Sequence, residues 1–159
     1  MKKLSVLIAI STIVFAAQAT FAQGEKELVI KTAQALALAP LDKETKKMEE
    51  KALKWTIETK DVHLIACGGT FMLFSDKKNK NSPDMTSAYM IGMAAFRLEN
   101  PAEDENGTQL AGLELALKVY EALVKEKPRT KNDSIEALLV KRGSGELAGL
   151  VNAAECGKK

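Results

Sequence analysis

A histidine and a cysteine four residues apart form the spacing in this sequence that is closest to a metal site. His63 and Cys67 share one face if their segment is helical, and imidazole and thiolate are both ligands of Zn²⁺. A site needs one or two further ligands, and no aspartate or glutamate continues this stripe. CxxC and CxxCH motifs are absent, which excludes a c-type haem. We therefore predict no metal site and no cofactor, and we interpret His63 as a core or rim residue.

Three methionines lie close together in an uncharged stretch. Met85, Met90 and Met93 could coordinate a soft metal or line an adaptable groove through their thioethers. Residues 85–96 carry no charge, which is typical of a helix buried in a core, where methionine fills irregular gaps. We interpret all three as core residues.

The acidic stretch 99–108 fails as a calcium loop. With its glycine at the sixth position, Asp104 and Asn106 take the third and fifth positions of an EF-hand. Ala102 and Leu113 then occupy the first and twelfth positions, where carboxylates are essential. We predict a loop with an Asn106-Gly107 turn.

Two sequences match the acceptor pattern for N-glycosylation, Asn106-Gly107-Thr108 and Asn132-Asp133-Ser134. They matter only in a host that glycosylates, and a turn and a helix cap explain both asparagines.

No local pattern of catalytic residues occurs. GxSxG, P-loop, HExxH and glycine-rich nucleotide motifs are absent, and the carboxylates are scattered at surface spacings without apolar surroundings. We predict that the protein is not an enzyme.

The first 22 residues are typical of a secretory signal peptide. Two lysines precede an uncharged apolar run over 4–17, and small residues follow up to Ala22, with Ala19 as the competing cleavage site. The run is shorter than the roughly 20 residues of a membrane span, and no cysteine follows for lipid attachment. We expect an exported protein, periplasmic or extracellular, with a single helical domain over 23–159.

The exported chain would be nearly neutral. The whole sequence has 23 Lys+Arg against 21 Asp+Glu, and the predicted signal holds two of the lysines. This balance gives no support to a nucleic acid or an anionic membrane as partner. Low aromatic content and many Ala, Leu, Lys and Glu residues favour helix over sheet.

Export also determines how the two cysteines are interpreted. In an oxidising compartment we predict that Cys67 and Cys156 form a disulfide, with two buried thiols as the alternative. The bond would tie the last helix to the middle of the chain, where a terminal helix would otherwise fray.

Leu110–Lys127 is the predicted centre of the fold. Apolar residues occupy most of its circumference, so that a single partner helix could not cover it. The remaining narrow arc is predicted to face water and to form two i,i+4 ion pairs, Glu114 with Lys118 and Glu121 with Lys125.

Other helices are predicted on both sides of this centre. Two precede residue 60, one over 25–38 and one capped by Asp42. Ser82-Pro83 begins a buried helix, in which Ala88, Gly92 and Ala95 would let another backbone approach closely. A helix capped at Asn132 or Asp133 and a last one from Ser144 complete an all-α fold of antiparallel helix pairs.

The segment 62–74 is ambiguous. It has no ionised side chain apart from His63, which indicates burial. As a helix it places His63, Cys67 and two phenylalanines on one stripe; as a short β-hairpin it turns at Gly68-Gly69. We favour the helix, because a lone hairpin among helices would need its edges covered.

Part of the chain resembles a tetratricopeptide repeat. Ala116, Tyr120, Leu123 and Pro128 resemble the second helix of the repeat, and Ile91-Gly92 resembles the Leu-Gly of its first helix. The resemblance implies a packed antiparallel helix pair, present once and without a peptide-binding groove. More loosely, the whole chain resembles small proteins that bacteria export, which implies no particular activity.

These observations favour a non-enzymatic interaction or binding module of the cell envelope, with an unknown protein as partner. The alternative is a carrier of a small ligand or a metal that uses the uncharged helices and His63.

Overall fold

The computed structural model describes residues 23–156, so the predicted signal peptide lies outside the described residues. Residues 23–38 are helical. The other elements are α2 (Lys43–Glu58), α3 (Gly68–Phe71), α4 (Ser82–Glu99), α5 (Glu105–Glu126), the short 3₁₀ turn η1 (Pro128–Thr130), α6 (Asp133–Gly143) and α7 (Leu147–Ala153). Within 23–156 there is no β-strand, which confirms the all-α prediction.

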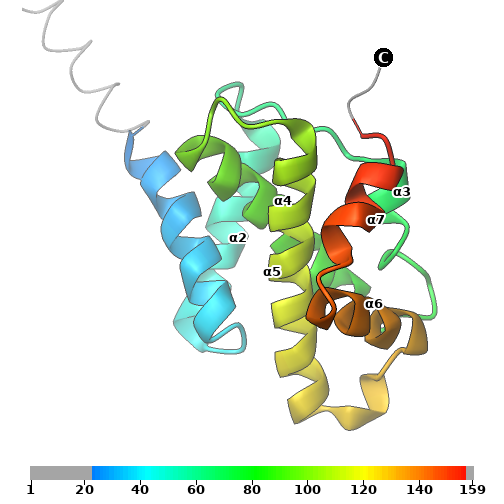
Figure 1. Cartoon of the computed structure of the whole chain (residues 1–159). Coiled ribbons are helices and arrows are strands. Elements are labelled where there is room, and N and C mark those ends of the chain that lie inside the picture. Colours follow the sequence, from blue (N-terminus) through cyan, green and yellow to red (C-terminus); the bar gives the residue numbers. More distant parts are fainter. Residues whose placement is uncertain (1–22, 157–159) are drawn as a thin grey trace, which may run out of the picture.

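The predicted central helix is confirmed as α5. It runs through the middle of the molecule, with residues 23–38 and α2 on one side and α6 and α7 on the other (Figure 1). Leu113, Leu117 and Tyr120 are fully buried, whereas Lys118 and Glu121 are exposed as expected. Burial on several sides therefore holds α5 in place.

The helix begins earlier than predicted, because Asp104 caps it. The Asp104 carboxylate accepts a hydrogen bond of 2.8 Å from the Gly107 N–H. Asn106 and Gly107 consequently lie in the first turn of α5, and the predicted Asn106-Gly107 turn is wrong.

Neither predicted ion pair along α5 forms. Glu121 instead accepts a hydrogen bond of 2.7 Å from the guanidinium of Arg142 on α6. A partner from another helix thus replaces Lys125, and surface pairs of this kind contribute little to stability.

Two hydrophobic cores lie on opposite faces of the α4–α5 pair. One contains Phe74, Met85, Leu113 and Leu117 and is closed by side chains of α6 and α7. The other contains Ala88, Ile91 and Val119 and is closed by side chains of residues 23–38 and α2. Helices α4 and α5 therefore form a middle layer that is buried from both sides.

Glycine lets the two middle helices approach closely. A Cβ atom added at Gly92 would lie 3.0 Å from the Cα atom of Gly112. The contacts Tyr89 with Gly112 and Phe96 with Gly107 show that α4 and α5 run antiparallel. The close approach predicted at Gly92 is confirmed, and its counterpart is the glycine of α5.

Segment 62–74 forms neither of the predicted structures. Residues 62–67 are not helical, and α3 is a single turn. Gln109 donates a hydrogen bond of 2.7 Å to the Ile65 carbonyl, and Gly69 lies directly against Ala154. Gln109 thus supplies a partner for one carbonyl of the non-helical stretch, and both Ile65 and Met72 are exposed despite the uncharged sequence.

The predicted disulfide between Cys67 and Cys156 is present, with the two Cα atoms 5.4 Å apart. It attaches the residue that precedes α3 to the turn that follows α7. The C-terminal helix is thus anchored to the middle of the chain.

A buried polar pair joins α4 to α5. Tyr89 and Gln109 are almost fully buried, and the Tyr89 hydroxyl donates a hydrogen bond to the Gln109 side-chain oxygen. Burial, reinforced by the negative charge of Glu105, raises the pKa of the Tyr89 hydroxyl. The folded protein therefore holds this phenol in its neutral form.

Alkaline pH should weaken the fold through this tyrosine. The pKa of Tyr89 is raised in the folded state. Its contribution to the free energy of unfolding is therefore fully present below the ordinary tyrosine pKa of about 10 and is lost as the pH rises further. We expect the free energy of unfolding, measured in urea at increasing pH, to fall less steeply above pH 10 in Tyr89→Phe. Below pH 10 the variant should be about 1–2 kcal/mol less stable, because the Gln109 oxygen loses its donor. Parallel alkaline declines in the two proteins would contradict this account.

Candidate functional site

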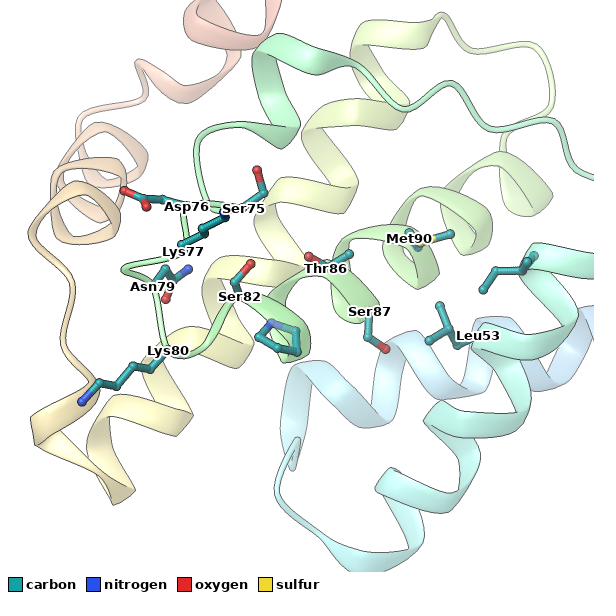
Figure 2. A pocket seen from close by; sticks show the side chains of 12 residues that line it. Leu53, Ser75, Asp76, Lys77, Asn79, Lys80, Ser82, Thr86, Ser87 and Met90 are labelled. Carbon is teal, nitrogen blue, oxygen red and sulfur yellow. The ribbon is translucent and has the colours of Figure 1, made fainter.

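A groove with a volume of about 690 Å³ follows the first half of α4. We call it the α4 groove. Figure 2 shows α4 as its floor, α2 on one side and the loop that precedes α4 on the other. Its lining residues are Leu53, Ile57, Ser75, Asp76, Lys77, Asn79, Lys80, Ser82, Pro83, Thr86, Ser87 and Met90.

The two walls of the α4 groove differ in chemistry. Leu53 and Ile57 are one helical turn apart on α2 and form an apolar wall, with 63% of Ile57 exposed. The opposite wall is the loop 75–81, from which Lys77 and Lys80 are exposed. The groove therefore has an apolar wall on one side and, on the other, a loop that carries Lys77, Lys80 and Asp76, with the Lys80 side chain extending away from α2 (Figure 2).

Buried asparagines hold the loop wall in place. Asn79 donates a hydrogen bond of 2.8 Å to the Phe74 carbonyl, and its side-chain oxygen accepts one from the Asn81 N–H. Asn81 in turn donates to the Thr130 carbonyl at 3.0 Å. With three lysines and two asparagines, residues 75–83 have the composition of a solvated loop; the lysines are exposed as this composition predicts, whereas the two asparagines are buried.

Ser87 places an unpartnered hydroxyl at the floor. The residue is 9% exposed, and its Oγ atom has no hydrogen-bond partner among the described residues. Figure 2 shows it pointing toward the α2 side of the groove, near Leu53. A buried hydroxyl without a partner has lost its hydration, so a polar group that reached it would be favoured.

An ionic bridge ties α2 to the start of α4 beside the groove. The Lys46 ammonium donates hydrogen bonds to Glu49 at 2.9 Å and to Asp84 at 2.7 Å. Burial lowers the pKa of Lys46, but the hydrogen bonds and charges of Asp84 and Glu49 outweigh it, so that the pKa is raised overall. Lys46 stays charged at neutral pH and fixes the spacing between floor and wall.

The residues that the sequence analysis considered as possible metal ligands lie in separate places in the structure. Cys67 is bonded to Cys156, so its sulfur is not a free thiolate beside His63, and His63 is exposed on a non-helical segment. Met85 and Met93 are buried in the core, as predicted. Met90 is only partly buried and lies at the floor of the α4 groove. Among residues 23–156, no cluster of three or more His, Cys, Asp or Glu side chains is arranged to hold a metal ion.

The two asparagines of the glycosylation patterns have structural positions. Asn132 caps α6, accepting hydrogen bonds from Ser134 and Ile135 N–H groups, as predicted. Asn106 lies inside α5, and Thr108 of the same pattern is fully buried.

Sequence reasoning did not find the α4 groove. Its walls come from α2 and from a loop, and no short motif links them. Met90 gave a partial indication of the groove, because a group of methionines is typical either of a hydrophobic core or of an adaptable groove.

The fold and the groove together define an all-α protein with an asymmetric surface groove between two helices and a loop. Searches against protein-family models, curated proteins and solved structures gave no significant match. Among the described helices, none combines the length and the apolar character needed to cross a membrane.

Proposed function

We propose that this protein is a non-enzymatic interaction module of the cell envelope, which binds a helical segment of a partner protein in the α4 groove. The observation that carries the proposal is the pairing of an apolar wall with a basic wall along one helix. An amphipathic helix has the complementary surface, with an apolar stripe beside a charged one.

Shape supports a helix as the occupant. Leu53 and Ile57 are spaced by four residues on α2, and Pro83, Ser87 and Met90 follow each other along α4 at steps of four and three. Side chains at i, i+3 or i+4, and i+7 of a bound helix match a groove of this periodicity.

The lysines of the α4 groove support a bound helix that carries acidic residues along one flank. Lys77 and Lys80 line the groove, and the neighbouring Lys78 is exposed on the same loop. Asp76 is the one acidic residue of this wall, and its carboxylate already accepts the Lys78 N–H. Opposite charges at the rim would speed association and suppress partners of the wrong sign.

The envelope location rests on two supports. The Cys67–Cys156 disulfide persists in an oxidising compartment, and the first 22 residues are typical of an export signal.

Ile57→Glu is the direct test of the groove. The unmodified protein and the Ile57→Glu variant are each used to select binders from a displayed library of amphipathic helical peptides. We expect acidic peptides to be enriched on the unmodified protein and to bind at least about tenfold more weakly to the variant, because Ile57 supplies exposed apolar surface that binding would bury. Its exposure means that the melting temperature should hardly change.

Val140→Glu is the matched control, since Val140 is also an apolar helical residue, is 72% exposed and does not line the groove. The proposal is overturned if no peptide is enriched, if enriched peptides are basic, or if both variants lose binding equally.

A further inference from the structure

A second hollow, of about 570 Å³, lies on another part of the molecule and contains His63. We call it the His63 cleft. It is formed by residues of the first helical stretch, the connection after α2, the end of α4 and the start of α5. Its lining residues are Lys26, Asp61, Val62, His63, Ile65, Arg97, Leu98, Pro101 and Glu105.

The floor of the His63 cleft holds a largely buried ion pair with unused bonding capacity. Arg97 donates to the Glu105 carboxylate at 3.0 Å, and their side chains are 21% and 13% exposed. Arg97 also donates to the Glu103 carbonyl. A guanidinium has five N–H donors, so three remain, and a carboxylate with about four acceptor positions keeps two after Arg97 and Gln109.

Gln109 holds both the Arg97–Glu105 ion pair and the cleft wall in place. Its side-chain nitrogen donates to Glu105 at 2.6 Å and to the Ile65 carbonyl at 2.7 Å, and its oxygen accepts from Tyr89. One buried amide therefore orients the carboxylate and holds the non-helical segment that carries His63. Such a site is preorganised, so ligand binding would order little of the protein.

A second and more exposed ion pair also lines the His63 cleft. Lys26 and Asp61 form an ion pair of 2.8 Å and remain partly exposed. His63 is exposed and has no hydrogen-bond partner in the part of the chain that the structure describes. The cleft thus contains two ion pairs, with a free imidazole and apolar side chains from Val62, Ile65 and Leu98.

We propose that the His63 cleft binds a small zwitterion of the free α-amino-acid class. A ligand with net charge would be repelled by one member of each pair, whereas a carboxylate and an ammonium one carbon apart match neighbouring opposite charges. The carboxylate takes the remaining Arg97 donors with help from His63, and the ammonium takes the free acceptor positions of Glu105. An apolar ligand side chain lies on Val62, Ile65 and Leu98.

The proposal does not depend on the α4 groove and is tested separately. Calorimetric titration of the full protein uses L-leucine, glycine, L-glutamate and L-lysine as probes. 4-Methylpentanoate and 3-methylbutylamine are matched analogues of leucine that lack its ammonium or its carboxylate. We expect L-leucine to bind saturably and both analogues to bind at least about tenfold more weakly, because each loses a charge-assisted hydrogen bond.

Two variants locate the binding. Arg97→Gln should weaken L-leucine binding at least about tenfold, and His63→Ala should weaken it less while hardly changing the melting temperature, since His63 is exposed and forms no hydrogen bond or ion pair with the described residues. The proposal is overturned if L-leucine does not bind, if L-glutamate or L-lysine binds more tightly than L-leucine, if an analogue binds as well as L-leucine, or if His63→Ala and a folded Arg97→Gln both retain full affinity.

Discussion

Replacing Cys67 and Cys156 together by alanine is expected to lower the free energy of unfolding by about 4 kcal/mol. The bond joins residues that are 89 positions apart, so its loss releases a long loop in the unfolded chain. Both cysteines are buried, and alanine keeps their positions apolar. Urea unfolding of the oxidised protein and of the double variant, compared by linear extrapolation, measures the difference.

Reductant provides the internal control for this comparison. Treating the unmodified protein with reductant should bring its unfolding curve close to that of the double variant, which should itself be insensitive. A double variant that loses less than about 1 kcal/mol would show that the bond constrains little beyond what packing already fixes.

Gly112→Ala is expected to destabilise the protein by about 2 kcal/mol or more, although alanine favours a helix by about 1 kcal/mol over glycine. The added Cβ atom would lie 2.6 Å from Met93 Cγ and 2.7 Å from the Tyr89 carbonyl oxygen. A side chain can move, but the carbonyl oxygen belongs to the α4 backbone, so the two middle helices must separate. Chemical denaturation measures the loss.

Gly149→Ala supplies the matched control on α7. An added Cβ atom there meets no atom within 4 Å, so only the helix preference acts and stability should rise by up to about 1 kcal/mol. Shifts in the same direction for both variants would refute close helix packing as the cause of the loss at Gly112.

The parts of the fold that sequence reasoning predicted well depend on local signals. Apolar residues around most of α5 predicted its central position, and Pro83 marked the beginning of α4. Of the two residues predicted as the cap of α6, Asn132 or Asp133, the structure has Asn132. The pairing of Cys67 with Cys156 followed from their number and from the predicted export.

The parts that it predicted wrongly are determined by contacts between distant residues. Segment 62–74 has a helical stripe, but its backbone is held by Gln109, 44 residues beyond Ile65, and by the disulfide. Glu121 had a suitable partner one turn away on its own helix, yet Arg142 lies closer in space. Neither contact leaves a periodic trace in the sequence.

The candidate sites were predictable only in part. His63 was singled out for its spacing to Cys67, and the structure places it in a cleft with Arg97 and Glu105 instead. The α4 groove depends on the buried Asn79 and Asn81, which in sequence belong to a polar, lysine-rich loop. A site assembled from three or four separate elements has no motif of its own.

The burial of α4 and α5 on both faces has a consequence for the local stability of the elements that cover them. The disulfide joins two segments whose neighbouring elements pack in one hydrophobic core, whereas residues 23–38 and α2 pack on the opposite face of α4 and α5 and carry no cysteine that could cross-link them. We therefore expect local unfolding of these first two helical stretches to require less free energy than unfolding of the cross-linked half, which native-state hydrogen exchange would measure. Because α2 supplies the apolar wall of the α4 groove, local unfolding of α2 would remove the groove while the disulfide stayed intact.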